Sequence, residues 1–147
     1  MQLSSTAFQE GAVIPVEHTG DGEDRSPPLA WSGAPGAAKS FALVCDDPDA
    51  PRGAWVHWVL FNLLADQHGL PAGGSLPPGA RQGKNDFGKL GYGGPAPPRG
   101  KPHRYFFKLS ALDTALDLPA GATKAQLVDA MKGQILAEGQ LVGNYGR

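Results

Sequence analysis

The feature that most restricts the fold of this chain is a set of three short, dense apolar runs separated by stretches rich in glycine and proline. The runs occupy residues 40–45, 56–62 and 103–112 and contain many β-branched and aromatic side chains. Such runs are typical of central strands that are covered on both faces. The 21 glycines and 14 prolines favour turns between them. The sequence therefore predicts a mostly β protein with short strands and long, ordered loops.

Size, charge and cysteine content restrict the class of protein further. The 147 residues fit one domain, residues 1–147, large enough to bury a core without disulfides. Cys45 is the only cysteine and lies in an apolar run, so we interpret it as a buried structural thiol. The net charge of −1 argues against general attraction to nucleic acid or to anionic membranes. With neither a signal-peptide pattern nor an apolar run of membrane-spanning length, we expect a soluble, cytoplasmic protein without stable membrane association.

One helix is predicted near the C-terminus. Thr123 is a suitable N-cap, and apolar side chains recur after it at helical spacing. The predicted face consists of Leu127, Ala130, Met131, Gln134 and Ile135. We expect the helix to end near residues 138–139, and residues 140–147 to form a last strand or an extended tail.

Two polar clusters each precede an apolar β-type run. The first, Asp47-Pro48-Asp49-Ala50-Pro51, leads to Trp55-Val56-His57-Trp58, and the second, Gly91-Tyr92-Gly93-Gly94-Pro95, leads to His103-Arg104-Tyr105. Together they hold two of the four histidines, a pair of carboxylates and a glycine-rich loop. These groups suit the binding of an anion, so a pocket formed by both clusters is the predicted functional site.

Strand alternation predicts which side chains of the clusters share a face. His103, Tyr105 and Phe107 form one set, and His57 aligns with Val59 and Phe61. Each histidine thus begins an otherwise apolar strand face, where a pocket can open to the loops.

The turn after the first run contributes carboxylates to this pocket. Asp49 suits capping of the turn better than ligand contact, and Asp47 is the better candidate for the pocket. The Ala50–Pro51 bond is a candidate for the cis form.

The residue types explain why an anion is the expected ligand. An imidazole beside a carboxylate is favoured in its protonated form, and Tyr105 can donate a hydroxyl hydrogen bond. Glycines 91, 93 and 94 can direct backbone N–H groups into an anion nest. This loop alone is weak evidence, because the phosphate-loop and dinucleotide-binding patterns are absent.

The remaining polar residues have simpler interpretations. His18 and His68 are expected to be solvated, and residues 21–24 to form an exposed acidic turn rather than a calcium site. Arg104 is expected to pair with a structural carboxylate. Trp55 and Trp58 are either core residues or pocket wall.

The order of these motifs resembles the phosphatidylethanolamine-binding protein (PEBP) family, and more narrowly its bacterial and archaeal, Raf kinase inhibitor-like branch. Besides the two clusters, the resemblance includes Ser26-Pro27-Pro28-Leu29-Ala30-Trp31 and Leu141-Val142-Gly143, so that it covers almost the whole chain. It implies an antiparallel β-sandwich with a large central sheet, a small second sheet and one or two short helices near the C-terminus.

The resemblance also implies a shallow pocket for phosphate-like anions and phospholipid head groups. The ligand-binding residues that it implies are Asp47, Trp55, His57, Gly93, Gly94, Pro95, His103 and Tyr105. Members of this branch often have cysteine where this chain has Gly20 and Ala96, so any pairing of those positions is lost. The segment from Pro51 to Trp55 is short, which implies a more open rim than in animal relatives.

Three hypotheses of function follow. The leading one is a non-enzymatic binding protein for a small anion such as the phosphoryl group of a lipid head group, a nucleotide or a phosphorylated partner residue, with no catalytic residue, metal or cofactor. The alternative is an inhibitor or regulator of a kinase or protease that works through the surface around the pocket. A hydrolase that uses Asp47, His57 and His103 as metal ligands or as an acid–base pair is the third. A homodimer is plausible.

Overall fold

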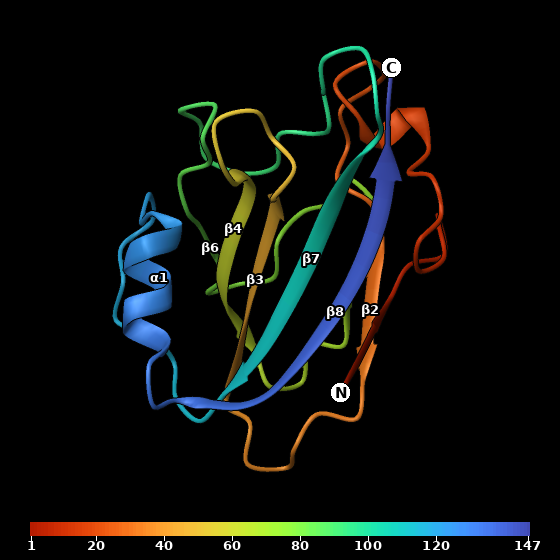
Figure 1. Cartoon of the computed structure of the whole chain (residues 1–147). Coiled ribbons are helices and arrows are strands. Elements are labelled where there is room, and N and C mark those ends of the chain that lie inside the picture. Colours follow the sequence, from red (N-terminus) through yellow and green to blue (C-terminus); the bar gives the residue numbers. More distant parts are fainter.

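Two antiparallel sheets make up the molecule (Figure 1). The computed structural model describes residues 1–147. The large sheet has five strands in the order β6-β4-β3-β7-β8, and the small sheet has three in the order β1-β2-β5. The strands are β1 (Gln2–Ser4), β2 (Leu29–Ser32), β3 (Ser40–Asp47), β4 (Trp55–Leu64), β5 (Gly69–Leu70), β6 (Arg81–Gln82), β7 (His103–Leu112) and β8 (Ile135–Tyr145), with a 3-10 turn at Val16–His18 and one α-helix, α1 (Lys124–Met131). The predicted β-sandwich is confirmed.

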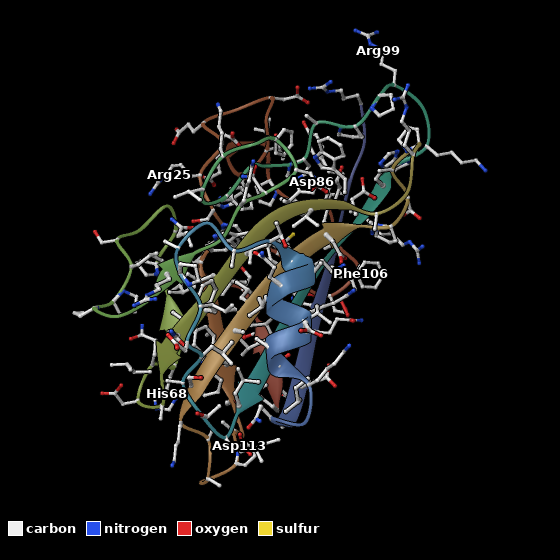
Figure 2. The ribbon with its side chains drawn as sticks, turned by 90° about the vertical axis from the view of Figure 1, so that its left-hand side faces the viewer. Arg25, His68, Asp86, Arg99, Phe106 and Asp113 are labelled. Atoms are coloured by element: carbon white, nitrogen blue, oxygen red, sulfur yellow. The ribbon has the colours of Figure 1, made fainter.

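The centre of the large sheet is covered on both faces, as the apolar runs predict, but the prediction fails for the first half of β7, where Arg104 and Lys108 are exposed. Every residue of its central strand β3 is buried. One face packs on the small sheet through a core that includes Phe41, Phe107 and Trp31. The other face packs on α1, which contributes Leu127 and Met131 to a second core (Figure 2). Residues that alternate along each strand therefore belong to different cores.

The helix begins where the sequence predicts and ends earlier. Thr123 and Gln126 form a capping box, in which each side chain accepts a hydrogen bond from the other residue's backbone N–H, at 3.2 and 2.9 Å. The last helical residue is Met131, because Gly133 adopts a φ of 76° and β8 begins at Ile135. The prediction of helix up to residues 138–139 is wrong: residues 135–139 pair with β7 as strand. The predicted last strand is confirmed as far as Tyr145.

A bulge in β4 determines where His57 points. Cys45 pairs with Trp58, but the next residue, Asp46, pairs with Val56, so His57 is an extra residue in β4. Unbroken alternation would place His57 with Val59 and Phe61, which belong to the core beneath α1. The prediction that His57 shares their face is therefore wrong.

The opposite face of the sheet receives His57 instead. Its ring packs edge-on against Tyr105, a member of the core between the two sheets, with ring centroids 5.1 Å apart. The bulge thus places His57 on the same face as His103 and Tyr105, which alternation along β7 keeps together.

Candidate functional site

The β3–β4 loop and the loop before β7 lie at the same end of the large sheet (Figure 1). Residues of both loops line a cavity of about 330 Å³. Its lining residues come from β3, β4, β7 and two loops, β3–β4 and β6–β7: Asp47, Ala50, Pro51, Arg52, Trp55, His57, Phe87, Ala96, Pro97, Pro98, His103 and Tyr105. The structure thus brings together Asp47, Trp55, His57, His103 and Tyr105. Gly93, Gly94 and Pro95 do not line the cavity, although the residues directly after them do.

Asp47 and His103 form a tightly hydrogen-bonded pair in the cavity wall. The buried Asp47 carboxylate accepts a hydrogen bond from His103 Nδ1 at 2.7 Å and one from the Asp49 backbone N–H at 2.8 Å. Asp47 therefore caps the turn, whereas the sequence favoured Asp49 for that task. Because Nδ1 is occupied, His103 presents Nε2 as its free nitrogen.

Asp49 faces the other way and pairs with Arg104. Its carboxylate accepts hydrogen bonds from Arg104 Nε and Nη2, both at 2.9 Å, and from the Arg104 backbone N–H at 3.0 Å. The side-chain hydrogen bonds from Arg104 lower the pKa of Asp49 to about 2. The predicted pairing of Arg104 with a structural carboxylate is confirmed, and the pair fastens the turn after β3 to β7.

The protonation state of His57 differs from the one expected. Its Nδ1 donates to the Gly93 carbonyl at 2.6 Å. Burial lowers the pKa of His57, although the hydrogen bond to Gly93 opposes this shift. The ring is therefore neutral near pH 7, and its Nε2 is a hydrogen-bond acceptor. Asp47 does favour the protonated ring, as expected of a neighbouring carboxylate, but the effect of burial on the pKa is larger.

Tyr105 contributes a hydroxyl that stays protonated, because burial raises its pKa. No side-chain or backbone group of the protein bonds to this hydroxyl, nor to Nε2 of His57 or His103. The only fully buried side-chain polar atom without a partner in the structure is Trp31 Nε1. The three unpartnered atoms of the site thus keep contact with solvent, and all three belong to residues that line the cavity.

The glycine loop is a support for the site and does not form the predicted nest. Gly93 N–H donates to the His57 carbonyl at 2.9 Å, and Gly94 N–H donates to Asp24 Oδ1 at 2.7 Å. Both donors are consumed inside the protein, so they do not converge on an anion. Gly93 instead holds both the backbone and the side chain of His57. Its N–H donates to the His57 carbonyl, and its carbonyl accepts from the His57 ring.

The N-terminal segment supports the same loop. His18 is buried, with Nδ1 at 2.9 Å from the Arg25 carbonyl, and Tyr92 donates its hydroxyl to the His18 carbonyl at 2.6 Å. The prediction that His18 is solvated is wrong, because the polar sequence around it folds under the loop. His68 is exposed as predicted, and so are residues 21–24.

Sequence reasoning missed Phe87 and Arg52, which also line the cavity. Phe87 is 42% exposed and packs edge-on against Trp55 and His57, with centroid distances of 5.6 and 5.4 Å. The available signal was a single aromatic residue inside a segment of turn-forming residues. Trp55 is pocket wall, whereas Trp58 is core and donates its indole N–H to Gln82.

Four further expectations can be compared with the structure. The Ala50–Pro51 bond is trans. Cys45 is buried, and burial raises the pKa of its thiol, as suits a structural residue. Asp47, His57 and His103 do not form a group of three side chains that could hold a metal ion. No helix has the length and apolar character needed to cross a bilayer.

These features define a small antiparallel β-sandwich with a histidine-containing cavity at one end of its large sheet. The family model described as phosphatidylethanolamine-binding protein matches residues 4–146. The chain belongs to the phosphatidylethanolamine-binding protein family.

Known relatives agree over almost the whole chain. The UPF0098 protein of Methanothermobacter thermautotrophicus is 54% identical over 151 residues, which span 100% of this chain and 99% of the relative. The crystal structure of CT736 from Chlamydia trachomatis, described as a phosphatidylethanolamine-binding protein homolog, has a TM-score of 0.94 and 41% identity, covering 99% and 97% of the two chains. Escherichia coli YbcL, a member of the mammalian PEBP family, has a TM-score of 0.93 and 36% identity, covering 99% and 98%.

Proposed function

We propose that this protein binds small, phosphate-like anions in the cavity between His57 and His103. The observation that carries the proposal is that three polar atoms without a protein partner line this one cavity: Nε2 of His57, Nε2 of His103 and the hydroxyl of Tyr105. A protein that folds around its own polar groups satisfies them where it can. Three such groups on residues that line the same cavity are suited to a ligand with several oxygen atoms.

The local charges support an anion over a cation. The Asp47 carboxylate is already engaged by His103 and by the Asp49 N–H, while Arg52 lines the cavity without an ion-pair partner. Tyr105 can only donate or accept as a neutral hydroxyl, because its pKa is raised. His103 is oriented by the hydrogen bond from its Nδ1 to Asp47, which directs the other ring nitrogen, Nε2, away from this carboxylate.

We further propose that the cavity binds its ligand without a chemical step. Its lining contains no serine, threonine or cysteine that could act as a nucleophile. The nearest thiol, Cys45, is buried and its pKa is raised, so it is neither accessible nor ionised near neutral pH.

An NMR titration of the imidazole rings with inorganic phosphate and with phosphorylethanolamine tests the proposal. Both ligands should shift the resonances of His57 and His103 and leave those of His68 unchanged, since His68 lies at the other end of the molecule (Figure 2). In the protein without ligand, the pKa of His57 is lowered. An anion bound beside the ring favours its protonated form, so binding takes up a proton. The affinity should therefore fall as pH rises from 6 to 8. Where binding takes up one whole proton, the fall is roughly tenfold for each pH unit.

Variants distinguish binding in the cavity from binding elsewhere. Asp47→Asn should weaken phosphate binding because it replaces the carboxylate that accepts the His103 Nδ1 hydrogen bond and orients the ring, whereas His68→Ala should bind like the wild type. Saturating phosphate that moves neither His57 nor His103 would disprove the proposal.

A further inference from the structure

The mouth of the cavity is bordered by two exposed aromatic rings. Trp55 is 38% and Phe87 42% exposed, and they are the only aromatic side chains among the exposed large hydrophobic residues. Their ring centroids are 5.6 Å apart at an interplanar angle of 78°, so they form a corner that borders the cavity. Exposure of apolar rings of this size is unfavourable unless another group covers them.

Phe87 is held in this exposed position by buried groups. Asn85 is 4% exposed, and its side chain accepts hydrogen bonds from the backbone N–H groups of Phe87 and Lys89 at 3.0 and 3.1 Å and donates to the Gly91 carbonyl at 2.9 Å. Gly93 allows the ring to approach, because a Cβ there would lie 2.5 Å from Phe87 Cδ2. The loop thus fixes an exposed ring beside His57, which is the geometry of a preformed binding surface.

The cavity is also larger than a simple anion needs. Each water molecule occupies about 30 Å³ in the liquid, so an ion with four oxygen atoms fills on the order of 120 Å³. More than half of the cavity of about 330 Å³ remains. Much of the remaining wall is apolar, formed by Pro97, Pro98 and Ala50 in addition to the two rings.

We propose that the bound anion carries a planar, uncharged ring that lies in the corner formed by Trp55 and Phe87. This inference rests on the proposed function, and it specifies the class of ligand as aryl esters of phosphate or similar aryl anions. A ring there can stack on one side chain and meet the edge of the other.

Arg52 favours an uncharged ring over a cationic group. It lines the same cavity and has no ion-pair partner. Arg52 would repel a quaternary ammonium group, because both are positively charged. Its guanidinium group can instead stack favourably on a planar ring.

Calorimetric titration of the wild-type protein with methyl phosphate, phenyl phosphate and phosphocholine tests the inference. Phenyl phosphate should bind roughly tenfold more tightly than methyl phosphate, in line with the energies of aromatic pairs, and phosphocholine no more tightly than methyl phosphate. The phenyl-to-methyl preference should fall to about threefold or less in Phe87→Ala, since one of the two rings is removed. Leu90→Ala is the matched control, because Leu90 is 58% exposed in the same loop and does not line the cavity; it should keep the preference.

The outcomes separate this inference from the proposed function. Equal affinity for phenyl and methyl phosphate would overturn the aromatic site and leave anion binding intact. Phosphocholine as the tightest ligand would overturn it in favour of a cation site, and no binding of any of the three would overturn both proposals. If Phe87→Ala folds poorly, Phe87→Leu replaces it, because leucine keeps apolar volume without a ring. This variant should lose the preference for phenyl over methyl phosphate to the same extent.

Discussion

At the scale of single residues, two carboxylates in one turn have different tasks. Asp47 is buried and bonds His103 in the cavity, while Asp49 pairs outside it with Arg104. The residue types predicted one pocket carboxylate and one structural carboxylate at these positions, and the structure confirms that Asp47 lies in the cavity wall. The choice of Asp49 as the turn cap was wrong, because the Asp49 side chain is occupied by Arg104.

The pair of Asp49 and Arg104 gives a prediction about acid stability. The pKa of Asp49 is lowered from 3.8 to about 2, so its carboxylate form is favoured in the folded state. The pair should therefore stabilise the protein above about pH 4 and lose this contribution as pH falls towards 2. Because the side chain of Arg104 is 54% exposed, we expect less than about 1 kcal/mol.

Urea unfolding of wild type and Asp49→Asn between pH 2 and 7 measures this contribution. The difference in unfolding free energy should be largest at neutral pH and should be mostly lost by pH 2, since the folded-state pKa of Asp49 is about 2. Asp66→Asn is a control at an exposed carboxylate without an ion pair and should show no such trend. A difference for Asp49→Asn that stays constant down to pH 2 would show that the ion pair is not its cause.

At the scale of strands and helices, periodicity predicted the central strands but not their irregularities. Runs of β-branched and aromatic residues identified β3, β4 and β7, because β3 and most of β4 are buried on both faces and β7 is buried on both faces from Leu109 onward. The extra residue His57 leaves no mark on an already continuous apolar run, so the bulge could not be foreseen. The end of α1 was missed because Gln134 and Ile135 continue the helical spacing beyond Gly133.

Gly133 gives the prediction that belongs to this scale. Its φ of 76° lies in the left-handed region, and a Cβ there would meet no atom within 4 Å. Gly133→Ala should therefore destabilise the protein through backbone conformation alone, by about 1–2 kcal/mol in chemical unfolding. Gly36→Ala is the matched control, because that glycine is equally open and has no left-handed φ; it should be neutral or slightly stabilising. Equal effects of the two substitutions would contradict a conformational role for Gly133.

At the scale of the whole molecule, the cavity depends on contacts between segments that are distant in the chain. The N-terminal segment supports the glycine loop through Asp24 and His18, and Asp21 accepts hydrogen bonds from Tyr145 and Arg147 at the C-terminal end. The sequence predicted that the two polar clusters meet, since both lie at the ends of central strands. It could not predict that the N–H groups of the glycine loop turn inward, because their acceptors come from other parts of the chain.

The proximity of Gly20 and Ala96 tests this arrangement directly. A Cβ on Gly20 would lie 3.2 Å from the Ala96 Cβ, and Gly20 N–H already bonds the Pro95 carbonyl at 2.8 Å. Disulfides have Cβ separations of about 3.5–4.5 Å, so Gly20→Cys with Ala96→Cys should form a bridge after a small adjustment. The oxidised form should be more stable than the reduced form of the same variant by about 2–4 kcal/mol.

Cys45 should not compete, because it is buried and its pKa is raised. Thiol titration and urea unfolding with and without reductant measure both effects, with the single variant Gly20→Cys as control. Two free thiols that persist at positions 20 and 96 under mild oxidation would show that the N-terminal segment does not hold the cavity wall in solution as it does here.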